Sequence, residues 1–283
     1  MRSSSDVMVI GKPQWLCLAI GALAFIACSA QQRIQAETLA AKTLISDSDE
    51  EQLGQQVKQE LEQKQHVRYI QDPAITGYVQ DVGNRVFQFA SKERPNLHWR
   101  LQVIDDPKTV NAFATPGAYV YVYSGLLLAA DNEAELAGVL AHESGHVVAR
   151  HSARNLIDAY GLQAITALAL GKNPSLLAQI AASIAANGTL LAHSRSDENE
   201  ADEYGARYSS MAGYDPRGLV TFFQKLEAKE GKTSQVMAWL SDHPATPDRI
   251  AHITRFIAEH NLSGSDLGAE RLAPIKQRLA SSH

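Results

Sequence analysis

Two histidines and a glutamate stand in the string His142-Glu143-Ser144-Gly145-His146, inside a stretch of apolar residues at helical spacing. Because four residues make a little more than one helical turn, both imidazoles leave the same face of the helix and can bind one Zn²⁺ ion. Glu143 lies between them, where its carboxylate can reach a water on that metal. The string therefore predicts a zinc hydrolase in which Glu143 is the general base and acid.

A catalytic zinc ion needs a third protein ligand and an open position. The only cysteines are Cys17 and Cys28, close to the N-terminus, so this ligand must be a histidine or a carboxylate. Glu198 is the candidate, and Asp202 lies four residues later on the same helical face, where it can hydrogen-bond a ligand histidine. Taken alone, this acidic run is typical of a solvated helix, but the histidine pair upstream favours the ligand. We expect Glu200 to point into solvent.

Two further side chains could support the chemistry. Arg249 follows a proline-containing turn and is the candidate donor to an oxyanion, with a surface or capping arginine as the alternative. His151 lies five residues after His146 and therefore off the ligand face, so we expect it to pack or hydrogen-bond rather than bind metal.

The elements that must position these residues follow from hydrophobic periodicity and turn signals. Alternating Tyr and Val at 118–123 suit a half-buried strand at a sheet edge, although a covered core strand is the alternative. The apolar runs 156–170 and 176–186 predict a packed helical hairpin, against membrane-dipping helices. The sequence predicts further helices near 53–61, 73–86, 132–156, 197–211, 219–227 and 248–259, and a strand near 98–104.

The N-terminal segment has the features of an export signal. Arg2 and Lys12 precede an apolar run at 15–27 that is too short to make a comfortable transmembrane helix. We expect a signal peptide at 1–27 and a tether at 28–45. Cys28 after a small residue resembles the lipobox of bacterial lipoproteins and would then be acylated, while ordinary cleavage near Ala30 is the alternative.

Composition narrows the class of protein. With 45% hydrophobic residues in 283, the chain can bury a sizeable core. A formal net charge of −5 and the lack of Lys/Arg-rich runs argue against a nucleic-acid partner.

The string HESGHVVARH, followed about fifty residues later by SRSDENEAD, resembles the HtpX, BepA and LoiP group of zinc metallopeptidases, the minigluzincins, whose patterns are HExxH and ExxxD. Similar strings lie at 110–114, 123–126 and 242–250, so the likeness covers roughly residues 45–257. We expect the chain to be closest to the small LoiP-type outer-membrane lipoproteins, because few residues follow Arg249.

The resemblance implies an α+β fold: a mainly helical gluzincin-type metallopeptidase domain at 46–262 with a small β-sheet whose edge strand binds substrate, then a C-terminal tail at 263–283. It implies one Zn²⁺ per chain, with Glu143 catalytic and Asp202 behind a ligand. The implied ligands are His142, His146 and Glu198, and the implied substrate-binding residues are Asn111, Ala118, Tyr119, Val120 and Tyr121.

Two further histidines need separate treatment within this resemblance. His243, in a His-Pro pair, can be an extra ligand or a plug over the metal, and an ordinary loop histidine is equally consistent with the sequence. His193 stands where the group often carries an aromatic residue, which affects local packing rather than zinc binding.

The function implied is a zinc-dependent endopeptidase acting on unfolded or misassembled cell-envelope proteins, exported to the bacterial periplasm and tethered to the outer membrane through Cys28. One alternative is a zinc-stabilised periplasmic chaperone or assembly factor with latent proteolysis. Another is an integral membrane peptidase anchored by the 156–186 runs.

Overall fold

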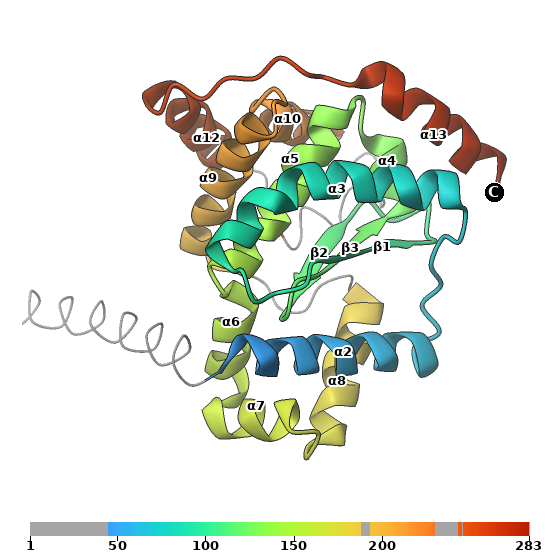
Figure 1. Cartoon of the computed structure of the whole chain (residues 1–283), viewed down its shortest axis with the longest axis vertical. Coiled ribbons are helices and arrows are strands. Elements are labelled where there is room, and N and C mark those ends of the chain that lie inside the picture. The colour runs from blue at the N-terminus through green and yellow to red at the C-terminus, as the bar shows by residue number, and fades with distance from the viewer. Residues whose placement is uncertain (1–44, 188–192, 230–242, 245, 283) are drawn as a thin grey trace, which may run out of the picture. The chain divides into compact units, whose positions relative to one another are not determined.

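The structure is a computed structural model that describes residues 45–187, 193–229, 243–244 and 246–282. The chain divides into two units, Met1–Leu44 and Ile45–His283, and the described residues all belong to the second. The predicted signal peptide, Cys28 and nearly all of the tether therefore lie outside the described residues. In chain order the elements are α2 (Asp47–Gln63), α3 (Pro73–Glu93), β1 (Arg100–Ile104), β2 (Ala112–Thr115), β3 (Tyr119–Tyr123), α4 (Ser124–Ala129), α5 (Glu133–Val148), α6 (His151–Tyr160), α7 (Leu162–Ala169), α8 (Pro174–Asn187), α9 (Arg195–Met211), α10 (Gly218–Lys229), α12 (Pro247–Glu259) and α13 (Ala269–Ser281) (Figure 1).

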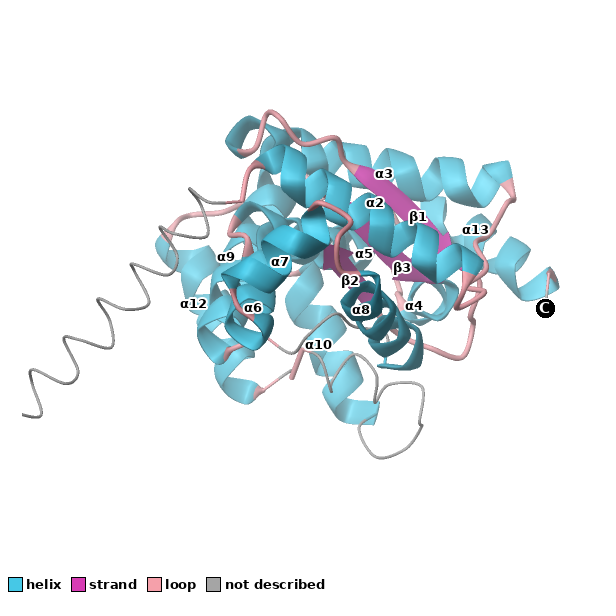
Figure 2. Ribbon diagram, turned by 90° about the horizontal axis from the view of Figure 1, so that it is seen from below, coloured by secondary structure: helices cyan, strands magenta, loops and turns pink. Residues whose placement is uncertain are grey.

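This architecture confirms the predicted α+β class, mainly helical with a small mixed sheet. The strand order is β1-β3-β2, with β3 parallel to β1 and antiparallel to β2 (Figure 2). The strand predicted to be the free edge is therefore the centre of the sheet. That prediction was wrong for its four residues, Ala118, Tyr119, Val120 and Tyr121, all of which are buried.

The reason lies in what the alternating side chains of β3 contact. Val120 and Val122 belong to the core that contains α3 and α5, whereas Tyr119, Tyr121 and Tyr123 belong to a second core with α2, α7 and α8. Helices thus cover both faces of the sheet. Alternation between two apolar residue types indicates two apolar faces, not one buried and one exposed face.

The edge nearest α5 is β2, a strand that the sequence did not predict. Its four buried residues include two alanines, which have low β-propensity, so neither alternation nor residue type identifies it. Tyr123 N donates to Asn111 O at 3.0 Å, which sets the register with β3. Residues 112 and 114 therefore direct their backbone N–H and C=O groups away from β3. Among the described strands, β3 is the only neighbour of β2.

The predicted motif helix is interrupted before its predicted end. α5 stops at Val148, Arg150 adopts a left-handed conformation with φ of 60°, and α6 begins at His151, so the prediction of one helix to about residue 156 was wrong. The Arg150 guanidinium donates to Ile45 O at 2.7 Å and pairs with Glu50 at 3.0 Å. These tertiary contacts stabilise a backbone conformation that a non-glycine residue rarely adopts, and no local sequence signal announces them.

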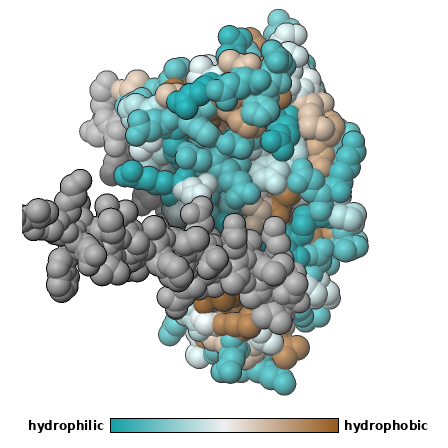
Figure 3. Space-filling model, turned by 90° about the vertical axis from the view of Figure 1, so that its left-hand side faces the viewer, coloured by the Kyte–Doolittle hydropathy of each residue, from teal (hydrophilic) through white to brown (hydrophobic). Residues whose placement is uncertain are grey.

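The predicted helical hairpin is present as α7 and α8, but its first arm starts later than predicted, because residues 156–160 belong to α6 and Gly161, with φ of 82°, separates the two helices. Leu168 of α7 and Ile180 and Ile184 of α8 are buried in one core with α2. Within the described ranges, no helix combines the length and the apolar character needed to cross a membrane. On the face shown in Figure 3, hydrophilic residues prevail above, and hydrophobic ones gather at the lower end, where α6 and α7 lie. Leu170, at the end of α7, is 55% exposed.

The predicted C-terminal tail is not a separate segment. It contains α13, which buries Leu272, Ile275 and Leu279. Arg271 of α13 pairs with Glu133 at 2.7 Å, in the first turn of α5. The folded unit therefore continues past the predicted boundary at 262 and anchors the start of the motif helix.

Candidate metal centre

The histidine string lies in the second half of α5, the most deeply buried helix described. Asn132 caps the helix by accepting a hydrogen bond from Glu135 N at 3.0 Å. His142, Glu143 and His146 are each at most 1% exposed. A helix buried all round, held at its first turn by Glu133, gives these side chains a rigid base.

The acidic ligand candidate comes from α9, which lies beside α5 (Figure 1). Ser194 caps α9 and forms a capping box with Asp197, so the helix starts one turn before Glu198. Small residues permit the close approach: a Cβ on Gly145 would lie 2.7 Å from Tyr204 Cβ and 3.1 Å from Ala201 Cα. The packing thus places Glu198 opposite the two histidines.

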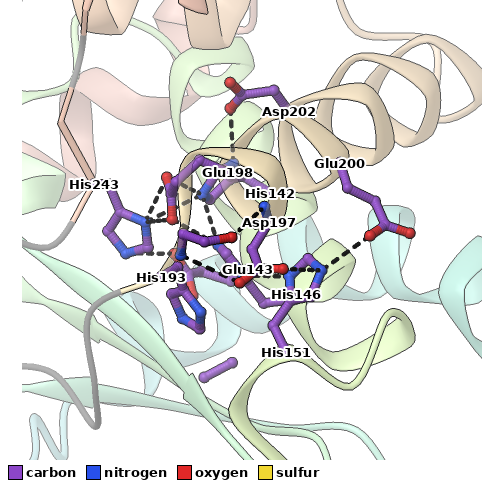
Figure 4. A network of polar contacts seen from close by, with 12 residues as sticks. His142, Glu143, His146, His151, His193, Asp197, Glu198, Glu200, Asp202 and His243 are labelled. Atoms are coloured by element: carbon purple, nitrogen blue, oxygen red, sulfur yellow. Dashed lines mark hydrogen bonds and ion pairs between the residues drawn. The ribbon is translucent and has the colours of Figure 1, made fainter. Parts of the chain in front are cut away.

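Three donor atoms converge at this contact (Figure 4). His142 Nε2 lies 3.0 Å from His146 Nε2, and these nitrogens lie 3.6 and 3.4 Å from the carboxylate oxygens of Glu198. Tetrahedral zinc with ligand bonds of about 2.0–2.1 Å requires ligand atoms about 3.3–3.4 Å apart. The spacing and the donor types therefore fit Zn²⁺.

The protonation of the two histidines suits the same role. Burial lowers the pKa of His142 and, more strongly, that of His146, so both rings are held neutral. Each Nδ1 has a partner on the far side: His142 Nδ1 lies 3.0 Å from Asp202 Oδ1, and His146 Nδ1 lies 2.8 Å from His151 Nδ1. Both Nε2 lone pairs therefore face each other and a carboxylate, an arrangement that a cation between them stabilises.

Arg249 connects the acidic residues of α9. Its guanidinium pairs with Asp202 at 2.7 Å and with Glu198 at 2.8 Å, and it is only 5% exposed. Burial opposes ionisation of Glu198, but the positive charge of His243 and its hydrogen bond to the carboxylate outweigh this effect and hold the pKa of Glu198 well below its ordinary value. Glu198 is therefore an ionised ligand.

His243 lies inside the same cluster. Its Nδ1 is 3.2 Å from His142 Nε2 and 3.1 Å from both carboxylate oxygens of Glu198, while its Nε2 is 3.6 Å from Glu143 Oε1. Burial lowers the pKa of His243, but the carboxylates of Glu198 and Glu143 overcome this effect and raise it to about 9. A fourth side chain thus occupies the space beside the three donor atoms.

Three residues behind His146 were assigned no site role from the sequence. His151 is fully buried and lies 3.1 Å from Glu200 Oε2, although Glu200 was expected to point only into solvent. His193 stacks on His146 with ring centroids 3.9 Å apart and lies within hydrogen-bonding distance of Asn155, at 2.9 Å. A histidine five residues after HExxH and an acidic residue between Glu198 and Asp202 were the available signals.

The predicted substrate residues lie in the central strand and at the start of the edge strand. Ala118, Tyr119, Val120 and Tyr121 line the centre of the sheet, whereas Asn111 directly precedes the edge strand β2. Asn111 is fully buried, and its Oδ1 accepts from Ala112 N at 2.9 Å.

Comparisons with known proteins agree with this geometry. The family model described as peptidase family M48 matches residues 73–257. The chain is 37% identical to the mitochondrial metalloendopeptidase OMA1 of Schizosaccharomyces pombe over 184 residues, which cover 65% of the chain and 53% of that protein. It is 34% identical to the putative beta-barrel assembly-enhancing protease of Vibrio cholerae over 249 residues, covering 83% of the chain and 50% of that protein. It is 32% identical to the beta-barrel assembly-enhancing protease of Escherichia coli over 221 residues, covering 75% of the chain and 44% of that protein. The chain thus spans about half the length of these relatives.

Proposed function

The chain belongs to peptidase family M48, and we propose that it is a zinc-dependent endopeptidase whose metal is bound by His142, His146 and Glu198. The observation that carries this proposal is the spacing of the three donor atoms, 3.0–3.6 Å, on two tightly packed helices. Two neutral imidazoles and one ionised carboxylate are a ligand set that catalytic zinc uses.

Zn²⁺ bound here supplies a Lewis acid and lowers the pKa of a water ligand towards neutrality. Glu143 does the proton transfer. It follows His142 directly on α5, and its Oε1 lies near His243 Nε2, on the side where His243 enters the cluster. Glu143 accepts a proton from the attacking water and passes it to the amine that leaves the cleaved peptide bond.

Arg249 holds the ligands in place in this proposal rather than donating to an oxyanion. Its nitrogens donate to Asp202 and to Pro244 O and pair with Glu198, so the guanidinium faces the carboxylates of α9. Asp202 in turn orients the imidazole of His142. This arrangement supports the predicted role of Asp202 and changes the role proposed for Arg249.

The substrate would pair with β2, the strand packed against α5. Backbone groups of Ala112 and Ala114 face away from β3, and Ala114 O also accepts from Ser152 Oγ at 3.2 Å. A peptide can add to such an edge only when its own backbone is extended and unpaired. This requirement favours unfolded segments over folded proteins as substrates, and Asn111 would lie where the peptide passes the start of β2.

His243 would act as a latch. Its Nδ1 lies 3.1–3.2 Å from His142 Nε2 and from the Glu198 oxygens, close to the spacing expected for a fourth ligand atom. A histidine in that position competes with the water that the reaction needs. The proposed resting form therefore has low activity until the His243 side chain leaves that position.

We also propose that the substrates are unfolded or misassembled envelope proteins. Two of the relatives described above carry the printed name beta-barrel assembly-enhancing protease, one of them as putative, which supports an envelope role. Export by a signal at 1–27 and tethering through acylated Cys28 would bring the enzyme to the same compartment. Replacing Cys28 by alanine should move the protein from the membrane fraction to the soluble periplasmic fraction if the tether exists.

One experiment tests the activity directly. Purified protein should contain one zinc per chain by mass spectrometry of metals and should hydrolyse unfolded casein, and a chelator should stop hydrolysis until zinc is restored. A stable protein with bound zinc that cleaves no casein, before and after replacement of His243, would contradict the endopeptidase. That result would favour a zinc-stabilised chaperone or assembly factor, whose cellular role should survive the Glu143→Gln substitution.

A further inference from the structure

His146 and His151 face each other through their Nδ1 atoms, 2.8 Å apart. One of these nitrogens must carry a proton, since two lone pairs at this distance repel each other. With His146 Nε2 bound to metal, the only proton on that neutral ring lies on Nδ1. His146 therefore donates, and His151 Nδ1 accepts.

This assignment fixes the next hydrogen bond. A neutral His151 that accepts at Nδ1 carries its proton on Nε2, and Nε2 lies 3.1 Å from Glu200 Oε2. The bonds thus run in one direction from the metal ligand through His151 to a carboxylate (Figure 4). Asp197 Oδ1 is farther from His151 Nε2, at 3.5 Å, and pairs with Arg154 at 2.6 Å.

The backbone holds His151 in this position. It is the first residue of α6, directly after the left-handed Arg150, and it is fully buried. A continuous helix would place residue 151 off the face that carries His142 and His146, because five residues correspond to about 500° of rotation. The break between α5 and α6 turns the ring back behind His146.

We propose that His151 and Glu200 are positioning residues of the metal centre, fixing the ring orientation and the Nδ1–H tautomer of His146 as Asp202 does for His142. This inference rests on the proposed metal site at His146. Carboxylates and other acceptors behind metal-bound histidines typically change metal affinity 10–100-fold when removed. The unusual feature is a second histidine inserted between the ligand and the carboxylate.

The same residues offer one competing arrangement. His146, His151 and His193 lie close enough to hold a metal ion themselves. Such an ion would need His146 Nδ1 as a ligand while Nε2 binds the first metal, which requires removal of the last proton from that ring. His193 also has its Nδ1 beside Asn155. The chain of hydrogen bonds from His146 through His151 to Glu200 requires neither the loss of that proton nor a change in the contact between His193 and Asn155.

Zinc affinity tests the proposal without substrate. The His151→Ala variant should bind zinc 10–100-fold more weakly in competition with a chelating dye. His151→Asn should remain within about threefold of the parent, because the amide oxygen can accept from His146 Nδ1–H. Glu200→Ala should weaken binding by a smaller factor. His252→Ala and Glu203→Ala are the matched controls, since they remove another His–Glu pair at 3.0 Å on α9 and α12.

Nitrogen-15 NMR of the zinc-loaded parent gives a second measurement. It should show His146 protonated at Nδ1 and His151 protonated at Nε2. Binding of two zinc ions per chain, the reverse tautomers, or unchanged affinity in both His151→Ala and Glu200→Ala would overturn the proposal. If His151→Ala does not fold, the test rests on the NMR tautomers of the parent protein and on the zinc affinity of Glu200→Ala, whose side chain is half-exposed. Neither measurement uses a peptide substrate. A protein without peptidase activity can therefore still confirm this chain of hydrogen bonds, and a protein with peptidase activity can still refute it.

Discussion

Arg249 donates to both carboxylate oxygens of Asp202, from Nε at 2.8 Å and from Nη2 at 2.7 Å. Its Nη1 lies 2.8 Å from Glu198 Oε2. One guanidinium therefore bridges two carboxylates one turn apart on α9, of which one faces the metal position and the other faces His142. Only a planar fork of donors can make these contacts together.

We expect Arg249→Lys to weaken zinc binding roughly tenfold, because an ammonium group retains the charge but cannot bind Asp202 at two points. Competition with a chelating dye measures this change. Arg255→Lys, on the exposed side of the same helix, is the control. Equal zinc affinity in the two variants would show that Arg249 contributes charge alone.

Glu143→Gln should keep zinc binding within about twofold and lower kcat for an unfolded substrate by roughly 10²–10⁴-fold. The amide has nearly the same shape but cannot take a proton from water. Zinc content and casein hydrolysis, measured on the same preparation, separate the two effects. Loss of zinc in this variant would mean that Glu143 helps to hold the metal.

The sequence identifies the proposed metal ligands because their spacing is local. His142 and His146 are one turn apart on a helix, and Glu198 and Asp202 repeat that spacing on a second helix. The family, the mainly helical α+β class and the zinc dependence follow from these strings and agree with the structure and the comparisons.

The parts that the sequence does not predict depend on tertiary contacts. Arg150 breaks the helix because distant backbone and acidic groups hold its side chain, and that break puts His151 behind His146. Sequence periodicity does not distinguish the central strand of a three-stranded sheet from an edge strand when helices cover both faces of the sheet. Periodicity therefore indicated β3 as an edge and missed β2.

Replacing His243 by alanine tests the proposed latch. If His243 excludes the reactive water in most of the protein molecules, His243→Ala should raise kcat/KM for casein-derived peptides roughly tenfold. This factor corresponds to a free-energy preference of about 1.4 kcal/mol for the form in which His243 occupies the water position. Zinc should stay bound through the three remaining ligands. A fall in activity with zinc retained would instead make His243 part of the catalytic machinery.

A proline at position 114 tests the substrate edge. The N–H of Ala114 faces away from β3, so Ala114→Pro removes a donor to the substrate while leaving the sheet hydrogen bonds in place. We expect kcat/KM to fall about 3–10-fold, the effect of one hydrogen bond of about 1 kcal/mol. Ala114→Val has a similar volume and keeps the N–H, so it is the control. Equal losses in both variants would place the peptide elsewhere.

The acidic anchor of α5 should make stability depend on pH. Burial opposes ionisation of Glu133, but hydrogen bonds from Arg271, Tyr214 and Tyr78 outweigh it and lower its pKa. Since the folded pKa of Glu133 lies below its unfolded pKa, these hydrogen bonds stabilise the fold at pH values above the ordinary glutamate pKa. They lose this effect as the pH falls through the lowered pKa.

Glu133→Gln should therefore reduce the free energy of unfolding by about 2–3 kcal/mol at pH 7. In urea titrations the difference in unfolding free energy between the parent protein and Glu133→Gln should become smaller as the pH falls below about 4. Glu62→Gln, which removes a partly exposed partner of Lys58, should cost less than about 1 kcal/mol at any pH. A gap for Glu133→Gln that stays constant down to acid pH would show that the glutamate acts through shape and not through charge.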